Sequence, residues 1–230
     1  MRYQDEEFAQ IERQMRVTEE MQKRAEQKMS GLSGSEQLSS DNLDDSDITD
    51  DERKILDDCF SKLPSQMEIN ENINNGHLQN DDLDVTFERT TFFEERISMK
   101  FPKDFFELKN DSDDYLIYYN FPKEINCLLS YVPADGEIEL KKIKKGILKN
   151  FKSSWIKTTW IEEGSKRVNG NNIGYSVLMN HTPELDIFNC MMFTLVKDGY
   201  VIINFNGNKN VYGIWLMIMK ALMETIEVSD

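Results

Sequence analysis

Two histidines and three cysteines are the side chains of this sequence best suited to nucleophilic or acid–base catalysis. His77 lies in an Asn-rich stretch, and His181 precedes a Thr-Pro turn. A catalytic histidine needs a neighbouring Ser or Cys nucleophile and an acid that orients the imidazole. Neither histidine is accompanied by a G-x-S-x-G or active-site cysteine signature. We therefore interpret both as solvated loop histidines.

The cysteines and the paired carboxylates carry no catalytic pattern either. Cys59, Cys127 and Cys190 are odd in number and far apart, which fits neither a disulfide framework nor a zinc ligand set. We expect them to be small apolar core residues in a reducing compartment. Glu94-Glu95 and Glu162-Glu163 are consecutive pairs, whose side chains point to opposite faces of a strand. We expect no catalytic residue and no enzyme activity, although a hydrolase site can be hidden in one sequence.

The acidic stretch Asp41–Glu52 partly matches a calcium-binding loop. Leu43 stands where that loop needs an oxygen ligand, and Ser46 stands where it needs glycine. Thr49 and Glu52 instead form a T-x-x-E capping box at the start of a helix. No glycine-rich loop lies between a strand and a helix to hold a phosphate. The sequence thus predicts no metal and no cofactor.

Charge divides the chain into two parts. Residues 1–92 hold 23 acidic and 10 basic side chains, whereas residues 93–230 hold 19 and 17 and all three tryptophans. A highly charged segment with few aromatic residues buries too little apolar surface to offset its chain entropy. The acidic part is therefore expected to be a helical or disordered arm, and residues 93–230 are expected to form the folded domain.

The net charge of -15 also limits the partners, because a negative chain repels nucleic acid. The longest apolar run, Ile214–Met219, is too short to insert across a membrane. The first residues lack the basic start and apolar run of a secretory signal. We expect a cytoplasmic protein that binds no nucleic acid and does not insert into a membrane.

The acidic arm contains two predicted helices. Residues 1–29 read as a charged amphipathic helix, with acid-before-base pairs four residues apart and a thin apolar stripe. That stripe includes three candidate partner-binding residues, Phe8, Ile11 and Met15. Residues 30–92 read as an acidic linker with a short helix at about 50–63. Whether the first helix is solvated or pairs with a partner stays open.

Alternating apolar residues and turn signals predict strands from residue 97 onwards. Pro102 is expected to end the first strand. The turns Asn169-Gly170 and Asp198-Gly199 predict hairpins, since glycine tolerates the positive φ of a tight turn. Helices are expected at 138–151, which is amphipathic, and at about 210–223, which is apolar on most of its surface. These patterns predict an α+β domain built on an antiparallel sheet with flanking helices.

Two further groups are candidates for binding a partner protein. Lys141, Lys142 and Lys145 lie on the outer face of the predicted 138–151 helix, where they either are solvated or attract an acidic partner. Trp155 and Trp160 have polar neighbours, which suits a half-exposed rim. Tryptophan is also enriched at binding hot spots. The alternative is that both indoles are buried and structural.

The order of signals over residues 93–228 resembles the PsbP-like α/β/α sandwich superfamily. The segments that carry the resemblance are Ile97–Phe105, Val168–Tyr175, the hairpin Met191–Val196 with Tyr200–Phe205, and Leu222–Val228. The acidic arm is not part of that pattern. The resemblance implies a non-enzymatic binding domain, since relatives include chaperones for secreted effectors.

Taken with the missing catalytic pattern, this resemblance favours a cytoplasmic adaptor or chaperone for another polypeptide, such as an apolar helical segment of a secreted effector. The alternative is an immunity or inhibitor protein that binds a folded basic partner through its acidic arm. A hydrolase is the third possibility. The oligomeric state is not indicated by the sequence.

Overall fold

The computed structural model describes residues 63–80, 83–134 and 157–229. All of these except Lys157 belong to one compact unit, which comprises Asp45–Ile138 and Thr158–Asp230. The helices expected at 1–29, about 50–63 and 138–151 lie outside the described residues, apart from Leu63. So do most of the candidate partner-binding residues, namely Phe8, Ile11, Met15, Lys141, Lys142, Lys145 and Trp155.

The larger part of the fold is a seven-stranded antiparallel sheet with the order β4-β5-β6-β10-β9-β8-β7. Its strands are β4 (Glu107–Asp111), β5 (Tyr115–Asn120), β6 (Ile125–Pro133), β7 (Lys157–Val168), β8 (Asn171–His181), β9 (Asp186–Val196) and β10 (Gly199–Asn208). Short 3-10 helices follow β5 and β10, at η1 (Phe121–Lys123) and η2 (Lys209–Val211). The α+β class and the antiparallel sheet predicted from the sequence are confirmed.

Two glycines at hairpin turns are required for different reasons. Asn169 and Gly170 have φ values of 48° and 87°, so the β7–β8 turn uses the left-handed region as expected. Gly199 does not take a positive φ. A Cβ atom there would lie 2.2 Å from the carbonyl oxygen of Val132 on β6. The β9–β10 hairpin therefore needs glycine because of the close approach of β6, and the reason inferred from the sequence is wrong.

A second, four-stranded sheet has the order β1-β2-β3-β11. It consists of β1 (His77–Gln79), β2 (Asp84–Phe92), β3 (Ile97–Lys103) and β11 (Glu227–Val228). Pro102 lies inside β3 rather than ending it. Proline is tolerated at a strand position whose N–H would point away from the neighbouring strand.

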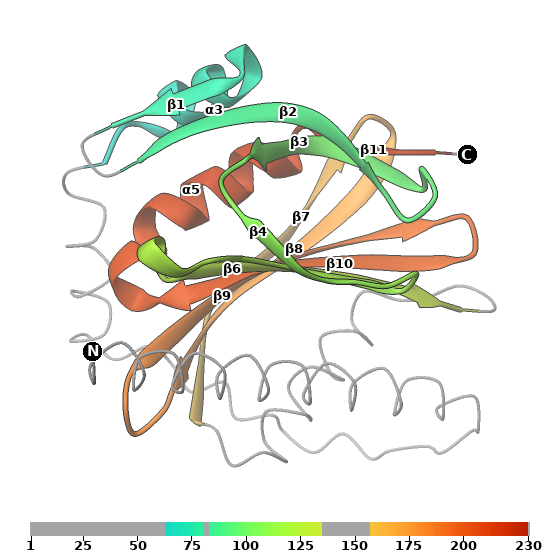
Figure 1. The fold of residues 1–230 in the computed structure, drawn as a ribbon. Helices are drawn as coiled ribbons and strands as arrows, with labels where there is room; N and C mark the ends of the chain where they lie inside the picture. The colour runs from blue at the N-terminus through green and yellow to red at the C-terminus, as the bar shows by residue number, and fades with distance from the viewer. Residues whose placement is uncertain (1–62, 81–82, 135–156, 230) are drawn as a thin grey trace. The chain divides into compact units, whose positions relative to one another are not determined.

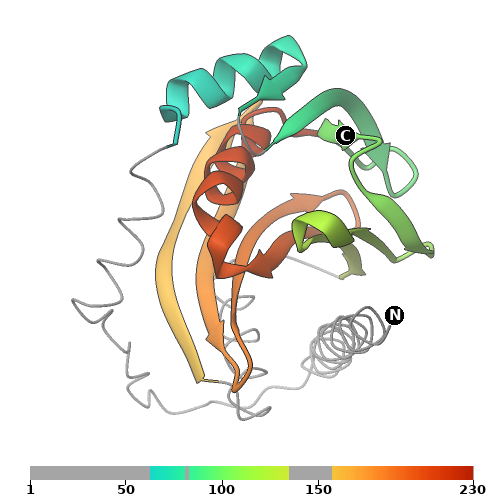
Figure 2. The ribbon, with the colours of Figure 1, turned by 60° about the vertical axis from the view of Figure 1, so that its left-hand side comes forward.

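Helix α5 (Tyr212–Met223) lies between the two sheets (Figures 1 and 2). Every residue of the helix except Lys220 is buried, as expected for a helix that is apolar on all sides. Trp215 at its centre is fully buried, and its ring stacks on Phe205 of β10 with centroids 5.5 Å apart. Helix α5 therefore links the two sheets through one apolar core. No helix in the described ranges has the length and apolarity needed to cross a membrane.

Residues 66–92 form part of this folded unit, although the sequence placed them in the linker. Helix α3 (Gln66–Asn75) begins with a capping box between Ser65 and Glu68 and ends at Gly76, which has a φ of 90°. Ile69 and Ile73 are fully buried in the core, and Gln66 donates a hydrogen bond to the carbonyl of Met217 on α5. Tertiary contacts thus order a segment whose own composition favours a loop.

Candidate binding cleft

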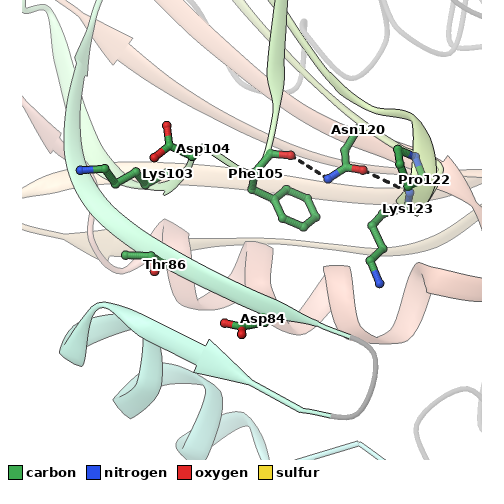
Figure 3. Close-up of a pocket in the computed structure, with 8 residues that line it drawn as sticks. All are labelled: Asp84, Thr86, Lys103, Asp104, Phe105, Asn120, Pro122 and Lys123. Atoms are coloured by element: carbon green, nitrogen blue, oxygen red, sulfur yellow. Dashed lines mark hydrogen bonds between the residues drawn. The ribbon is translucent and has the colours of Figure 1, made fainter.

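A cleft of about 420 Å³ opens between the four-stranded sheet and the end of β5. Its walls come from β2, from the end of β3 with the turn after it, and from β5 with η1 (Figure 3). The residues that line it are Asp84, Thr86, Lys103, Asp104, Phe105, Asn120, Pro122 and Lys123. The cleft therefore combines two lysines, two aspartates and an aromatic ring.

A repeated tetrapeptide builds two of these walls. Phe-Pro-Lys followed by an acid occurs at 101–104 and again at 121–124. In both copies the acidic residue adopts a positive φ, 53° for Asp104 and 50° for Glu124. Such a φ is uncommon outside glycine, and it turns the chain sharply. Each copy thereby places its lysine, Lys103 or Lys123, at the cleft.

Asn120 joins the two walls. Its Nδ2 donates a hydrogen bond to the carbonyl oxygen of Phe105 at 2.6 Å, and its Oδ1 accepts one from the backbone N–H of Lys123 at 3.2 Å (Figure 3). The Phe105 ring packs against Phe106 and Trp215, with centroids 4.9 and 5.6 Å apart. The cleft is therefore preorganised by side-chain hydrogen bonds and is anchored to the core.

Charges of both signs are held at the cleft by partners around it. Lys103 Nζ donates to Glu88 at 2.7 Å, and this hydrogen bond raises the pKa of Lys103. Asp84 Oδ1 lies 2.8 Å from His77 Nε2. Lys123 extends from η1 toward β2 (Figure 3). This arrangement can recognise a ligand that carries both charges and an apolar group, and the cleft residues include no nucleophile paired with a histidine.

His181 belongs to a separate polar cluster at the far end of the seven-stranded sheet. Its Nε2 lies 2.8 Å from Thr159 Oγ1 on β7, and its Nδ1 lies 2.9 Å from Asp186 Oδ1 on β9. Lys209 Nζ donates to Asp186 Oδ2 at 2.9 Å. His181 ends strand β8 and its side chain is only 22% exposed, so the interpretation as a solvated loop histidine is wrong.

The order hydroxyl, imidazole, carboxylate is that of an activated nucleophile. A nucleophile must reach a substrate atom, but Thr159 is only 5% exposed. The cluster joins three neighbouring strands and η2 through hydrogen bonds. We therefore interpret it as a structural hydrogen-bond cluster that holds these elements together. The sequence did not reveal this cluster because its members lie in four separate elements.

This cluster predicts a pH dependence of stability. Partial burial raises the pKa of Asp186, but the hydrogen bonds and charges of Lys209 and His181 outweigh it and lower the pKa below its ordinary value of 3.8. A carboxyl whose pKa is lower in the folded state stabilises the protein above the unfolded pKa. That stability is lost as the pH falls through the folded pKa.

Asp186→Asn is therefore expected to lower the melting temperature at pH 7 and to lower it much less at pH 2–3. Thermal melts followed by circular dichroism measure this difference. Asp113→Asn, in the exposed β4–β5 turn, is the matched control and should change neither melt. An equal loss at both pH values for Asp186→Asn would contradict the assigned charge interaction.

Among the partner-binding candidates that the sequence indicated, Trp160 lies on β7 and is half-buried. The remaining partner-binding candidates are outside the described residues. Cys127 and Cys190 are buried core residues as predicted, and burial raises the pKa of both thiols. The sequence missed every residue of the cleft, although the repeated Phe-Pro-Lys-acid tetrapeptide was visible in it.

Known proteins share this arrangement of elements. The chain is similar to the cyanobacterial PsbP (CyanoP) of Synechocystis sp. PCC 6803, with a TM-score of 0.52 over 66% of this chain and 98% of that one. The fold is PsbP-like. The two sequences are only 6% identical, so the similarity concerns the fold alone.

Two further structures align with this chain at lower scores. A protein from Bacteroides thetaiotaomicron VPI-5482 gives a TM-score of 0.42 at 14% identity, over 62% of this chain and 48% of that one. A Pseudomonas aeruginosa protein of unknown function gives 0.40 at 10% identity, over 63% and 98%. No family model matches the chain, and no curated protein matches it.

Proposed function

We propose that this protein is a cytoplasmic, non-enzymatic binding protein, an adaptor or chaperone for another polypeptide. The cleft lined by the two Phe-Pro-Lys-acid segments is the site that receives the partner. The observation that carries the proposal is the cleft lined by Lys103, Lys123 and Asp84, in which Asn120 holds two of the walls together through hydrogen bonds to Phe105 and Lys123. A PsbP-like fold is a scaffold and does not by itself assign a function.

The composition of the cleft indicates the kind of segment it holds. Phe105 offers an apolar surface in contact with the core, and the lysines and aspartates surround it. A polypeptide segment with one apolar side chain between charged residues complements this pattern. Rigid walls favour such binding because little conformational entropy is lost on association.

The test compares charge reversal inside and outside the cleft. Lys103→Glu/Lys123→Glu replaces two attractions to acidic groups of the partner by two repulsions. The double variant is expected to weaken partner binding by roughly tenfold or more. Lys109→Glu/Lys197→Glu changes the net charge equally, and Lys197 lies in the exposed β9–β10 turn.

Partners are cross-linked to the full chain in cell extract, identified by mass spectrometry, and then titrated in purified form by calorimetry. Binding that survives reversal in the cleft but falls in the control pair would overturn the site. Capture of a folded basic protein, lost at high salt and unchanged by both variants, would favour the inhibitor alternative instead.

A further inference from the structure

Strand β2 has an edge that no described strand covers along most of its length. β1 pairs only with its first three residues, Asp84–Thr86. The next residue, Phe87, donates its N–H to the carbonyl of Gly76 at 2.8 Å. Beyond that point β2 continues to Phe92 along the rim of the four-stranded sheet, with β3 on its other side (Figure 1).

The hydrogen bonds of neighbouring residues show which backbone groups face this edge. Lys100, opposite Arg89, donates its N–H to Thr225 Oγ1, away from β2. Pro102, opposite Phe87, has no N–H to give. In an antiparallel pair such non-bonded positions alternate with bonded ones. Arg89 and, two residues on, Thr91 therefore direct both N–H and C=O away from β3.

We infer that Arg89 and Thr91 pair with an extended segment of the partner polypeptide, which adds a fifth strand to the four-stranded sheet. The inference rests on the proposed function and names the form of the partner. Strand addition of this kind satisfies two N–H and two C=O groups at an exposed edge. An antiparallel segment would continue the direction of β1, which is itself antiparallel to β2.

The register determines which partner side chains fit. The partner residue beside Thr90 lies on the face that Thr90 shares with Met99, which is fully buried, so this residue should be apolar. The residues beside Arg89 and Thr91 lie on the opposite face, where Arg89 and Lys100 are cross-strand neighbours. Glu227 forms an ion pair with Arg89 at 3.0 Å, so one anionic side chain there accompanies two cationic ones, Arg89 and Lys100. An acidic–apolar–acidic sequence complements this edge.

The edge does not require a partner to remain soluble. Glu88 and Arg89 are charged and exposed, and charges on an edge strand discourage pairing with unsuited chains. The same side chains leave the outward backbone groups accessible to a segment of the right charge.

The experiment uses the full chain labelled with ¹⁵N and the probe peptide acetyl-Thr-Asp-Val-Asp-Thr-amide at millimolar concentration. Without peptide, the amides of Arg89 and Thr91 should exchange with solvent much faster than those of Glu88 and Thr90, which bond to β3. With peptide, the Arg89 and Thr91 resonances should shift, and their exchange should slow at least about fivefold, as expected for one hydrogen bond of about 1 kcal/mol.

Variants of β2 separate the contribution of the backbone hydrogen bonds to peptide binding from that of the side chains. Arg89→Pro removes the outward N–H and leaves the ladder to β3 intact, so it should abolish the peptide-induced shifts. Arg89→Ala keeps the N–H and should retain shifts at Thr91. Thr90→Pro breaks the ladder to β3 and should lower the melting temperature. That loss would show that the alternation of inward and outward backbone groups along β2 is assigned correctly.

Three results would overturn the inference. The first is equal peptide binding by Arg89→Pro and the unaltered chain, and the second is peptide-induced resonance shifts that are confined to other residues. The third is protection of the Arg89 and Thr91 amides that grows with protein concentration alone, which would mean that a second copy covers the edge. If a captured partner tolerates Arg89→Pro but not Lys103→Glu/Lys123→Glu, strand addition fails while the proposed function stands.

Discussion

Replacing Trp215 by alanine is expected to lower the free energy of unfolding by about 3–5 kcal/mol, because it leaves a cavity in the centre of the core. The indole is fully buried between the two sheets, with the rings of Phe105, Phe106 and Phe205 around it at 5.5–5.8 Å. For a domain of this size the melting temperature should fall by roughly 10 °C. Urea and thermal unfolding followed by circular dichroism measure both quantities.

Trp160→Ala is the matched control, since it removes the same side chain from a half-buried position on β7. Its cost should be clearly smaller. If the two variants lose equal stability, the central packing role of α5 is incorrect. Because Phe105 contacts Trp215, the tryptophan variant should also loosen the cleft, and Phe105→Leu tests that connection separately.

A chain that begins at residue 93 is expected not to fold, whereas one that begins at Asp45, the start of the compact unit, is expected to melt cooperatively. The shorter chain lacks α3, β1 and β2. It therefore loses seven side chains that are at most 5% exposed, Ile69, Ile73, Leu78, Leu83, Val85, Phe87 and Phe92. At about 1.5–3 kcal/mol each, their burial contributes roughly 10–21 kcal/mol, as much as the whole stability of a typical domain or more.

Circular dichroism melts and the dispersion of amide resonances distinguish the two outcomes. The domain expected from the sequence, 93–230, leads to the opposite result. A cooperative melt of the shorter chain would show that the four-stranded sheet tolerates the loss of β2, and it would restore that boundary.

Local patterns were sufficient to predict most of the fold. The alternation from Ile97 onwards, the hairpin signals at Asn169-Gly170 and Asp198-Gly199, and the apolar helix at 210–223 correspond to β3, the β7–β10 hairpins and α5. Each of these signals arises from contacts between residues close in sequence or from one buried face, so the pattern is readable without the tertiary structure.

The structure of residues 66–92 was harder to predict from the sequence because its stability comes from contacts with distant residues. Ile69 and Ile73 are the two buried positions in an Asn-rich helix, and the hydrogen bond from this helix to α5 joins residues 151 apart in the sequence. Composition alone favoured a linker there. The capping box at Ser65 and Glu68 was the local signal that could have indicated a helix.

The cleft could not be assembled from the sequence, since its walls come from residues near 85, 104 and 121 whose proximity depends on how the two sheets pack. The same holds for the hydrogen-bond cluster of Thr159, His181 and Asp186. Only the repeated Phe-Pro-Lys-acid tetrapeptide was available beforehand, and its meaning depends on the positive φ that follows each lysine.

The position of α5 between the sheets has a consequence for synthesis of the protein on the ribosome. The helix and the strand β11 that follows it are made last among the described elements, yet both sheets pack around that helix and β3 pairs with that strand. The inner faces of the earlier strands therefore remain uncovered until residue 228 has left the exit tunnel. Nascent chains with such long-range contacts fold slowly and expose apolar surface meanwhile. This chain should thus depend on ribosome-associated holding factors throughout its translation.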